Sequence, residues 1–438
     1  MILTIAIAGI TAVSMITAVL IKPYIKIKGK EVGLYWIICL LGAITMIATG
    51  RISLLSVFNG ITAQSSVNPL KILTLFLSMT LLSVYLGDAG FFDYVADVVF
   101  AKSKGGQFKL FLILYLIVSI LTVFTSNDIV ILTFTPPVCI FAKKAKISPL
   151  PYLFGEFIAA NTLSMALIVG NPTNIYLAGS CGINFLEYLS VMFLPALAGG
   201  LVALGTLLLI FRKQLKEPIC KSQAGFIQTH AKSVKIYKTP MLIALFHLCL
   251  CIVLLALSDF IRVEMYIICL VLALSITVID LIYGLKTVYS AQPVLKSLKK
   301  EPFELIPFVL SMFVIVLALK ENGATDALGK ALLTRTKWDG ATFGVLSALS
   351  ANLLNNIPMS VLFEKIVGGQ SLIAVYGCII GSNVGAFFTP VGALAGIMWS
   401  KILKKYGVKM PFSKFVLYGS AVAFPTLLAS VGTLILVF

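Results

Sequence analysis

The chain has 438 residues, of which 59% are hydrophobic and only 12% are charged, and its formal net charge is +17. A soluble domain of this size would carry about 25% charged residues, so the composition excludes a soluble globular protein and predicts a polytopic helical membrane protein. The apolar runs are continuous, which also excludes the alternating pattern of a transmembrane β-barrel. The charge does not indicate nucleic-acid binding, because most of the 34 Lys and Arg residues fall in loops that the positive-inside rule assigns to the cytoplasm.

Taken in chain order, ten apolar segments reach or approach the roughly 20 residues that a helix needs to cross a bilayer. Two further segments, 107–142 and 341–367, are predicted to be re-entrant hairpins that enter and leave on the same side. With the N- and C-termini outside, the basic loops lie on the inner face of the cell membrane. The predicted spans are at about 2–21, 32–50, 70–87, 150–180, 188–211, 241–258, 264–284, 303–320, 371–400 and 413–436.

The sequence nearly repeats itself, which predicts an all-α fold of two inverted-topology halves, each with a hairpin and a discontinuous helix. The N-terminal half is 1–211, the C-terminal half is 241–438, and a basic cytoplasmic linker, 212–240, joins them. One part of the repeat has an offset of 233 residues and pairs Leu77-Ser-Met79 with Leu310-Ser-Met312, Gly90 with Gly323, and Asp93 with Asp326.

The other part of the repeat lies around breaks in the apolar segments 150–180 and 371–400. Asn171-Pro-Thr173 interrupts the first, and Thr389-Pro-Val-Gly392 interrupts the second. Proline removes a backbone donor and kinks the chain, glycine permits unusual dihedral angles, and Asn or Thr supplies oxygen ligands. Paired interruptions of this kind indicate a transporter's binding site. The alignment pairs Gly155, Asn161, Val169, Gly170 and Ile175 with Gly377, Asn383, Val391, Gly392 and Ile397.

Each hairpin also has a polar tip, Thr125 to Asp128 in the first and Asn355-Asn356 in the second. Such groups are unfavourable against lipid, so we expect them in a buried cavity near the membrane midplane, where helix ends offer N–H groups or carbonyls to an ion. No metal ligands or organic cofactor are predicted. The predicted site residues are Ser126, Asn127, Asp128, Asn161, Gly170, Asn171, Pro172, Thr173, Asn355, Asn356, Asn383, Thr389, Pro390 and Gly392.

Two acidic side chains and one histidine need separate interpretation. Asp128 is the sole carboxylate at the first tip, and an ionisable residue inside a membrane indicates a proton relay or a cation ligand; its alternative role is to cap the following half-helix. Glu156 lies near the cytoplasmic entrance of its helix and is expected to snorkel to the surface. His247 is expected to be a buried, hydrogen-bonded residue, and pH sensing is the alternative.

Three segments resemble the ion transporter superfamily, and the nearest branch is that of the arsenical-pump permeases and NhaD-type sodium–proton antiporters. The segments are Ser126-Asn-Asp-Ile-Val-Ile-Leu-Thr-Phe-Thr-Pro136, Leu167-Ile-Val-Gly-Asn-Pro-Thr-Asn-Ile175 and Thr389-Pro-Val-Gly-Ala-Leu-Ala-Gly-Ile-Met-Trp399. The resemblance implies a scaffold domain that dimerises and an elevator-like transport domain that contains both hairpins. Divalent-anion:sodium symporters are more distant, because neither tip has their Ser-Asn-Thr motif, although Gly170-Asn-Pro-Thr-Asn174 is closer to their pattern.

The expected function is secondary active transport of a small anion or oxyanion, with arsenite or antimonite efflux driven by the proton motive force as the leading substrate assignment. The alternatives are a sodium–proton antiporter and a sodium-coupled transporter of an organic or inorganic anion, so the coupling ion is H⁺ or Na⁺. A third possibility is a membrane subunit for a soluble ATPase. The chain has no G-x-x-x-x-G-K-[ST] phosphate loop of its own. The expected partners are the lipid bilayer and a second copy of the chain.

Overall fold

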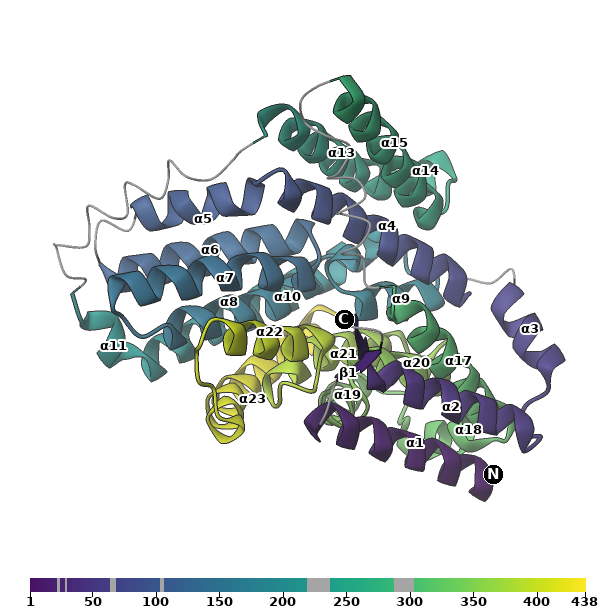
Figure 1. Cartoon of the computed structure of the whole chain (residues 1–438). Helices are drawn as coiled ribbons and strands as arrows, with labels where there is room; N and C mark the ends of the chain where they lie inside the picture. The colour runs from purple at the N-terminus through teal and green to yellow at the C-terminus, as the bar shows by residue number, and fades with distance from the viewer. Residues whose placement is uncertain (22–23, 28–29, 64–67, 103–105, 219–236, 287–302) are drawn as a thin grey trace.

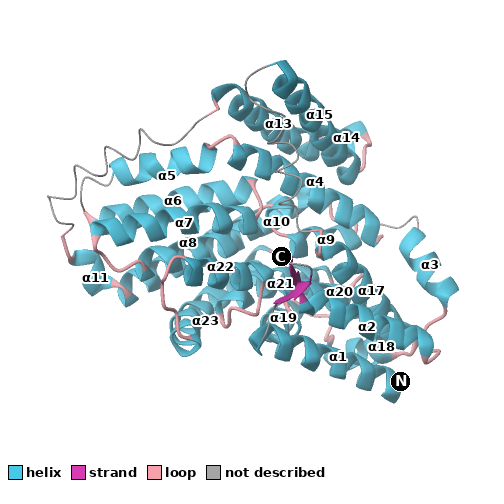
Figure 2. Cartoon of the chain, viewed as in Figure 1, coloured by secondary structure: helices cyan, strands magenta, loops and turns pink. Residues whose placement is uncertain are grey.

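The computed structural model describes residues 1–21, 24–27, 30–63, 68–102, 106–218, 237–286 and 303–438. These residues are almost entirely helical, and the exception is an antiparallel hairpin of β1 (Tyr24–Ile27) and β2 (Lys30–Gly33) (Figure 2). The prediction of an all-α fold therefore needs this correction. The hairpin lies where a basic loop was expected, and it contains the aromatic Tyr24 and the β-branched Ile25, Ile27 and Val32, residue types that favour strands.

One order of elements occurs twice along the chain. A long helix is followed by a short helix, then by two helices that meet at a polar tip, then by an interrupted helix and a final long helix. In the first half these are α4 (Pro69–Asp88), α5 (Phe91–Lys102), α6 (Gln107–Phe124), α7 (Asn127–Ala145), α8 (Leu150–Leu163), α9 (Pro172–Ser180) and α10 (Phe185–Ile210). In the second half they are α17 (Leu305–Glu321), α18 (Ala324–Leu332), α19 (Asp339–Leu354), α20 (Asn356–Val367), α21 (Leu372–Val384), α22 (Leu394–Lys405) and α23 (Phe412–Val437).

The remaining helices flank these two sets (Figure 1). α13 and α15 pack on α4, and α1 and α2 pack on α17. The predicted linker 212–240 contains α11 and the start of α13, but its residues 219–236 lie outside the described residues. The bounds of these elements are α1 (Ile2–Ile21), α2 (Leu34–Ala48), α3 (Leu54–Thr62), α11 (Arg212–Lys216), α13 (Lys238–Ala256), α14 (Ser258–Ile261) and α15 (Met265–Lys286).

The aligned glycines Gly90 and Gly323 occupy equivalent turns. Each directly follows a long helix and has a positive φ, +88° for Gly90 and +77° for Gly323, a conformation that costs glycine little because it has no Cβ. At the second turn, α17 and α18 form a bend of 74°. The aligned acids Asp93 and Asp326 then fall in the first turns of α5 and α18. There the partial positive charge of a helix N-terminus favours a carboxylate.

Close helix packing also recurs at the aligned pair Gly155 and Gly377. A Cβ on Gly155 would lie 2.7 Å from the Phe111 ring of α6, and one on Gly377 would lie 2.3 Å from the Gly340 carbonyl oxygen of α19. Glycine is therefore required where α8 approaches α6 and where α21 approaches α19. The two sets join mainly through α10 and α23. The predicted pseudo-two-fold axis and the opposite orientation of the halves in the membrane stay predictions.

Within the described residues, six helices are long and apolar enough to cross a bilayer, or seven if the bent pair α17–α18 forms one span. The sequence predicts about ten spans. That number includes the two interrupted helices, whose parts are each too short to cross alone, and the 15-residue α2. Conversely, α6 is long enough to cross by itself, although the sequence assigns it to a re-entrant hairpin.

Candidate functional site

The first hairpin tip lies between α6 and α7. Asn127 donates a hydrogen bond from Nδ2 to Asn161 Oδ1 on α8, at 3.0 Å. Asn161 in turn donates from its own Nδ2 to the Phe157 carbonyl, at 2.8 Å. Because that carbonyl can only accept, the amide orientations are fixed, and Asn127 Oδ1 remains as an acceptor. This atom and the neighbouring Ser126 Oγ are buried and have no hydrogen-bond partner among the described residues.

The first interrupted helix stops at Leu163 and resumes at Pro172, within the predicted range 150–180. Two short 3₁₀ turns, η1 (Ser164–Ala166) and η2 (Ile168–Gly170), fill the interruption. Asn171 caps the second part, and its Oδ1 accepts from the backbone N–H of Thr173 at 3.1 Å. A Cβ on Gly170 would lie 2.1 Å from the Ser164 carbonyl oxygen, so only glycine fits this turn.

Asn383 of α21 is the centre of a buried hydrogen-bond network that joins the two halves. Its Oδ1 accepts from Asn171 Nδ2 at 2.8 Å and from Ser164 Oγ at 3.1 Å, and its Nδ2 donates to Asn174 Oδ1 at 2.8 Å. Like its aligned partner Asn161, Asn383 also donates to the carbonyl four residues earlier. Each of the asparagines is at most 1% exposed. The first interruption is therefore bonded to the second half of the chain.

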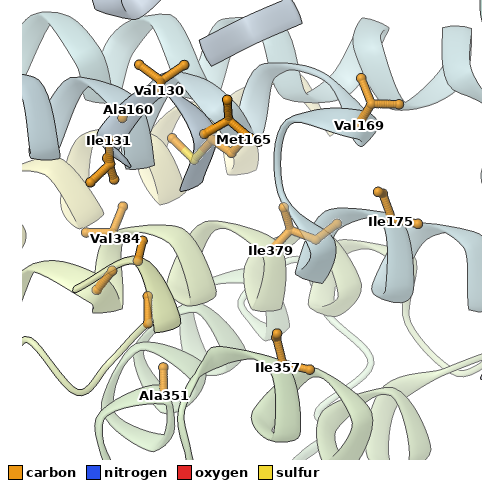
Figure 3. Packing of buried hydrophobic residues seen from close by; sticks show 14 of the residues in the cluster. Val130, Ile131, Ala160, Met165, Val169, Ile175, Ala351, Ile357, Ile379 and Val384 are labelled. Atoms are coloured by element: carbon orange, nitrogen blue, oxygen red, sulfur yellow. The ribbon is translucent and has the colours of Figure 1, made fainter. Parts of the chain in front are cut away.

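The apolar surroundings of this network come from both halves (Figure 3). Ile131 of α7, Ala160 of α8 and Met165 of η1 lie on one side, and Ile379 and Val384 of α21 face them. All five side chains are fully buried. Water is thereby excluded from the hydrogen bonds between the halves, which makes an unpaired polar group here costly.

The second hairpin tip is bonded to the second interruption, which lies between η4 (Gly385–Phe387) and α22. Asn355 has a φ of +72° and donates from Nδ2 to the Val391 carbonyl at 3.0 Å. The backbone N–H of Asn356 donates to the Gly392 carbonyl at 3.1 Å. Asn356 Oδ1 is buried without a partner among the described residues, like Asn127 Oδ1 at the first tip.

Hydrogen bonds of Thr389 and Asn352 link the two sides of this second interruption. Thr389 donates from Oγ1 to Asn352 Oδ1 at 2.6 Å, and Asn352 donates from Nδ2 to the Gly385 carbonyl at 2.8 Å. A Cβ on Gly392 would lie 2.8 Å from Asn352 Oδ1. Pro390 is only partly buried and follows Thr389 within the interruption. Glycine and proline thus shape the backbone at both breaks, as the sequence pattern predicts.

Asp128 does not join either network. Its side chain lines a cavity of about 460 Å³ between α4, α5, α7 and α22, and has no hydrogen-bond partner or ion pair among the described residues. Asp88 and Asp93 line the same cavity, and so does Thr80, whose buried hydroxyl has no hydrogen-bond partner in the described part of the chain. No three acidic, His or Cys side chains in the described part of the chain are grouped so that they could hold a metal ion.

The expectation that Glu156 reaches the surface is wrong. Glu156 is 0% exposed, and its Oε1 is 2.7 Å from Thr135 Oγ1 on α7. The close approach of α7 and α8 encloses this side chain. The expectation for His247 is confirmed: it is 5% exposed, and its ring nitrogens contact the Ile243 carbonyl at 2.8 Å and Ser275 Oγ at 3.2 Å.

Four polar residues of these networks are missing from the sequence prediction: Ser164, Asn174, Asn352 and Ser382. Asn174 lies within the segment 167–175 that carries the family resemblance, and Ser382 precedes the aligned Asn383, so adjacency to the repeat could have indicated both. Ser382 Oγ is 2.9 Å from Thr173 Oγ1. Ser164 and Asn352 carry no comparable signal. Ser164 lies within the aligned segment but is not one of its matched residues, Asn352 lies before the second tip, and both acquire their partners through tertiary packing.

The fold agrees with that of a known membrane transporter. The crystal structure of the Alcanivorax borkumensis YdaH transporter matches with a TM-score of 0.54 and 14% identity, covering 99% of this chain and 97% of that chain. At this identity the match establishes the fold alone. Together with the apolar helices, it supports a multi-pass helical membrane protein.

Sequence comparison gives the family. Residues 30–373 match the citrate transporter family (CitMHS). The arsenical pump membrane protein of Escherichia coli is 25% identical over 378 residues, covering 82% of this chain and 85% of that protein. The 46 kDa membrane protein of Mycobacterium leprae (strain TN) is 25% identical over 368 residues, covering 80% and 82%. The chain belongs to the citrate transporter family, and the predicted resemblance to the ion transporter superfamily is confirmed.

Proposed function

We propose that the protein is a secondary active transporter that exports arsenite or antimonite, driven by the proton motive force. The hairpins and interrupted helices would form a transport domain that moves in an elevator-like way against a scaffold. Both termini would lie outside, and two copies would associate through the scaffold. The observation that carries the proposal is a set of buried side-chain oxygens at the hairpin tips that have no hydrogen-bond partner among the described residues; they belong to Ser126, Asn127 and Asn356.

The chemistry of these oxygens suits a neutral hydroxide. Arsenite and antimonite are predominantly uncharged trihydroxides near neutral pH, so each presents three O–H donors. The amide oxygens of Asn127 and Asn356 can only accept, and a buried acceptor without a donor costs roughly 1–3 kcal/mol. A ligand that donates to them removes this cost. Residues 125–128, 164–174, 352–356 and 382–392 contain no Lys, Arg or His, which disfavours a multiply charged carboxylate. The name of the Escherichia coli relative supports the same substrate class.

The second candidate function is sodium–proton antiport or sodium-coupled anion transport. Carbonyl and carboxylate oxygens are also the ligands of hard cations, and Asp128 faces a cavity without a partner in the described residues. The family match supports a carboxylate anion as substrate for this alternative. Sodium-dependent dissipation of a pH gradient in vesicles, without any need for arsenite, would favour it.

The proposed function is tested by arsenite accumulation in everted membrane vesicles, with and without a protonophore. We expect accumulation that the protonophore abolishes. Purified protein in liposomes, energised by an imposed pH gradient, should give the same result, which would exclude an obligatory soluble ATPase. Failure of energised vesicles to accumulate arsenite or antimonite would contradict the proposal, and sodium and citrate would then be tested in the same preparation.

Alanine at either hairpin tip should weaken substrate binding. For Asn127→Ala and Asn356→Ala we expect the apparent affinity for arsenite to fall about fivefold each, since one hydrogen bond to the substrate contributes roughly 1 kcal/mol. The measurement is the concentration dependence of the initial transport rate. Asn184→Ala is the matched control, because Asn184 caps α10 away from the tips and should leave the affinity unchanged. Normal affinity in both tip variants would refute the site.

Asp128→Asn should weaken the coupling of transport to the proton gradient. The neutral amide keeps the size of the side chain but cannot exchange a proton, so we expect at least a tenfold lower limiting accumulation of arsenite. Counterflow of labelled arsenite without a gradient should persist. Asp326→Asn removes an exposed carboxylate at the start of α18 and should behave as wild type. Wild-type accumulation by Asp128→Asn would contradict a coupling role for Asp128.

A further inference from the structure

Glu156 is a second carboxyl group inside the predicted transport domain, on α8 five residues before Asn161. It is 0% exposed, and its Oε2 has no hydrogen-bond partner among the described residues. It also has no ion pair in the described part of the chain. An isolated carboxylate in such surroundings would be strongly unfavourable, so the group has to be neutral or to hold a cation.

The hydrogen bonds of Thr135 favour the neutral state. Thr135 Oγ1 lies 2.5 Å from the Ile131 carbonyl oxygen and 2.7 Å from Glu156 Oε1. The hydroxyl has one hydrogen, and a carbonyl oxygen has none. If Glu156 is ionised, Thr135 has to share this one hydrogen between both acceptors. If Glu156 is protonated, it can donate to Thr135 while Thr135 donates to Ile131, so that each contact has its own hydrogen.

No neighbouring cation offsets a negative charge on Glu156. The helices packed on α8 are α6, α7, α10 and α21, and aromatic side chains of α22 and α23 contact its Phe154 and Phe157. Asp128 faces the cavity at the start of α7, and the other charged residues of these helices are exposed or, for Lys414, partly exposed: Lys109, Lys143, Lys144, Glu187, Lys401, Lys404, Lys405 and Lys414. None of these lysines is ion-paired with Glu156. The remaining ionisable residues are Tyr115, Cys139, Tyr188, Tyr376, Cys378 and Tyr418, none of which is a cation.

The repeat argues against a purely structural role. Gly155 and Gly377 are aligned and both allow close helix packing, so the position after each has the same place in the repeat. This position is Glu156 in the first half and Cys378 in the second, and both are fully buried. Close packing of the motif therefore does not need a carboxyl group.

We propose that Glu156 carries a proton through the transport cycle in addition to Asp128. This proposal rests on proton-coupled export. When the domain faces outward, the Glu156 carboxylate takes up a proton from outside water. When it faces the cytoplasm, the O–H bond of the acid breaks, the proton passes to cytoplasmic water, and the substrate binds. One proton thus enters at Glu156 for each substrate that leaves, and no oxidant or reductant is needed.

The test is the limiting accumulation ratio of arsenite in liposomes at zero membrane potential and an imposed pH difference of one unit. For a neutral substrate, each coupled proton multiplies this ratio by about ten per pH unit, since one unit corresponds to 1.36 kcal/mol. Glu156→Gln should lower the ratio about tenfold and keep counterflow. Adding Asp128→Asn should abolish accumulation. Glu187→Gln, a change of an exposed carboxylate, should keep the wild-type ratio. Glu156→Met carries the same expectation should the glutamine variant fail to fold.

A second measurement detects the proton directly. The infrared spectrum of the wild-type protein at neutral pH should contain a carbonyl stretch of a protonated carboxylic acid that is absent from Glu156→Gln. A wild-type accumulation ratio in Glu156→Gln, or the absence of this band from the wild-type spectrum, would overturn the proposal while leaving proton-coupled export intact. Wild-type liposomes that accumulate no arsenite would instead contradict the proposed function, and the coupling role of Glu156 with it.

Discussion

Asn383→Ala should destabilise the protein more than any other single change of a side chain in the polar network, and transport should be lost. The substitution leaves Asn171 Nδ2 and Asn174 Oδ1 without their partners in a fully buried environment. Each orphaned group costs roughly 1–3 kcal/mol, so we expect a total loss of about 3 kcal/mol or more. The measurement is the thermal unfolding midpoint of the purified protein in detergent, together with arsenite accumulation in vesicles.

Two neighbouring substitutions serve as controls for Asn383→Ala. Asn161→Ala alters the aligned position, but within the described residues the Asn161 side chain is hydrogen-bonded to one other side chain, that of Asn127. Its effect on the midpoint should therefore be smaller. Ser382→Ala removes the contacts of Ser382 Oγ with Thr173 Oγ1, the Ile379 carbonyl and Asn383 Nδ2. Thr173 and Asn383 keep other hydrogen-bond partners, so the change should cost only about 1 kcal/mol. If Asn383→Ala unfolds at the same temperature as Ser382→Ala, the network does not join the two halves as described.

Gly170→Ala should distort the backbone turn between α8 and α9 and abolish transport. The new Cβ would lie 2.1 Å from the Ser164 carbonyl oxygen, which is backbone and cannot rotate away. That same carbonyl accepts from Asn174 Nδ2 at 2.9 Å, so the backbone shift would also break a bond of the network. Overpacking of this kind typically costs 1–3 kcal/mol, and we expect about 2 kcal/mol here. The unfolding midpoint and the counterflow rate are the two measurements.

Gly205→Ala is the matched control for this substitution. Gly205 lies within α10, and a Cβ there meets nothing within 4 Å. Alanine has the higher helix propensity, so the variant should be unchanged or more stable by about 0.5–1 kcal/mol. Equal behaviour of Gly170→Ala and Gly205→Ala would mean that the turn between α8 and α9 tolerates a side chain. The interruption would then not have the close contacts described for it.

Local chemistry explains why the breaks could be located from the sequence. Pro172 has no backbone N–H and cannot continue a preceding hydrogen-bonded turn. Gly170 occupies a turn in which a Cβ would clash with the backbone, and Asn171 caps the helix that follows. These effects depend only on a few neighbouring residues. The same reasoning applies to the paired turns at Gly90 and Gly323, where the repeat in sequence corresponds to a repeat in backbone conformation.

The surroundings of the two acidic residues could not be predicted from local sequence patterns. Asp128 and Glu156 are both carboxylates in apolar segments, and the sequence cannot distinguish their surroundings. The structure places Asp128 on a cavity and encloses Glu156 beside Thr135, because α7 and α8 pack face to face there. The snorkelling expectation failed because it considered the position of Glu156 along its own helix and not the helix that covers it.

The sequence by itself determined the membrane class, the places where helices break and the polar residue types at those breaks, because composition, proline, glycine and capping act over a few residues. Only the tertiary structure decided which groups meet: Asn383 bonds to the interruption of the other half, about 210 residues away along the chain, whereas Asn355 bonds to the interruption of its own half. Hydrogen bonds between distant segments depend on how whole helices pack. No local pattern specifies that packing.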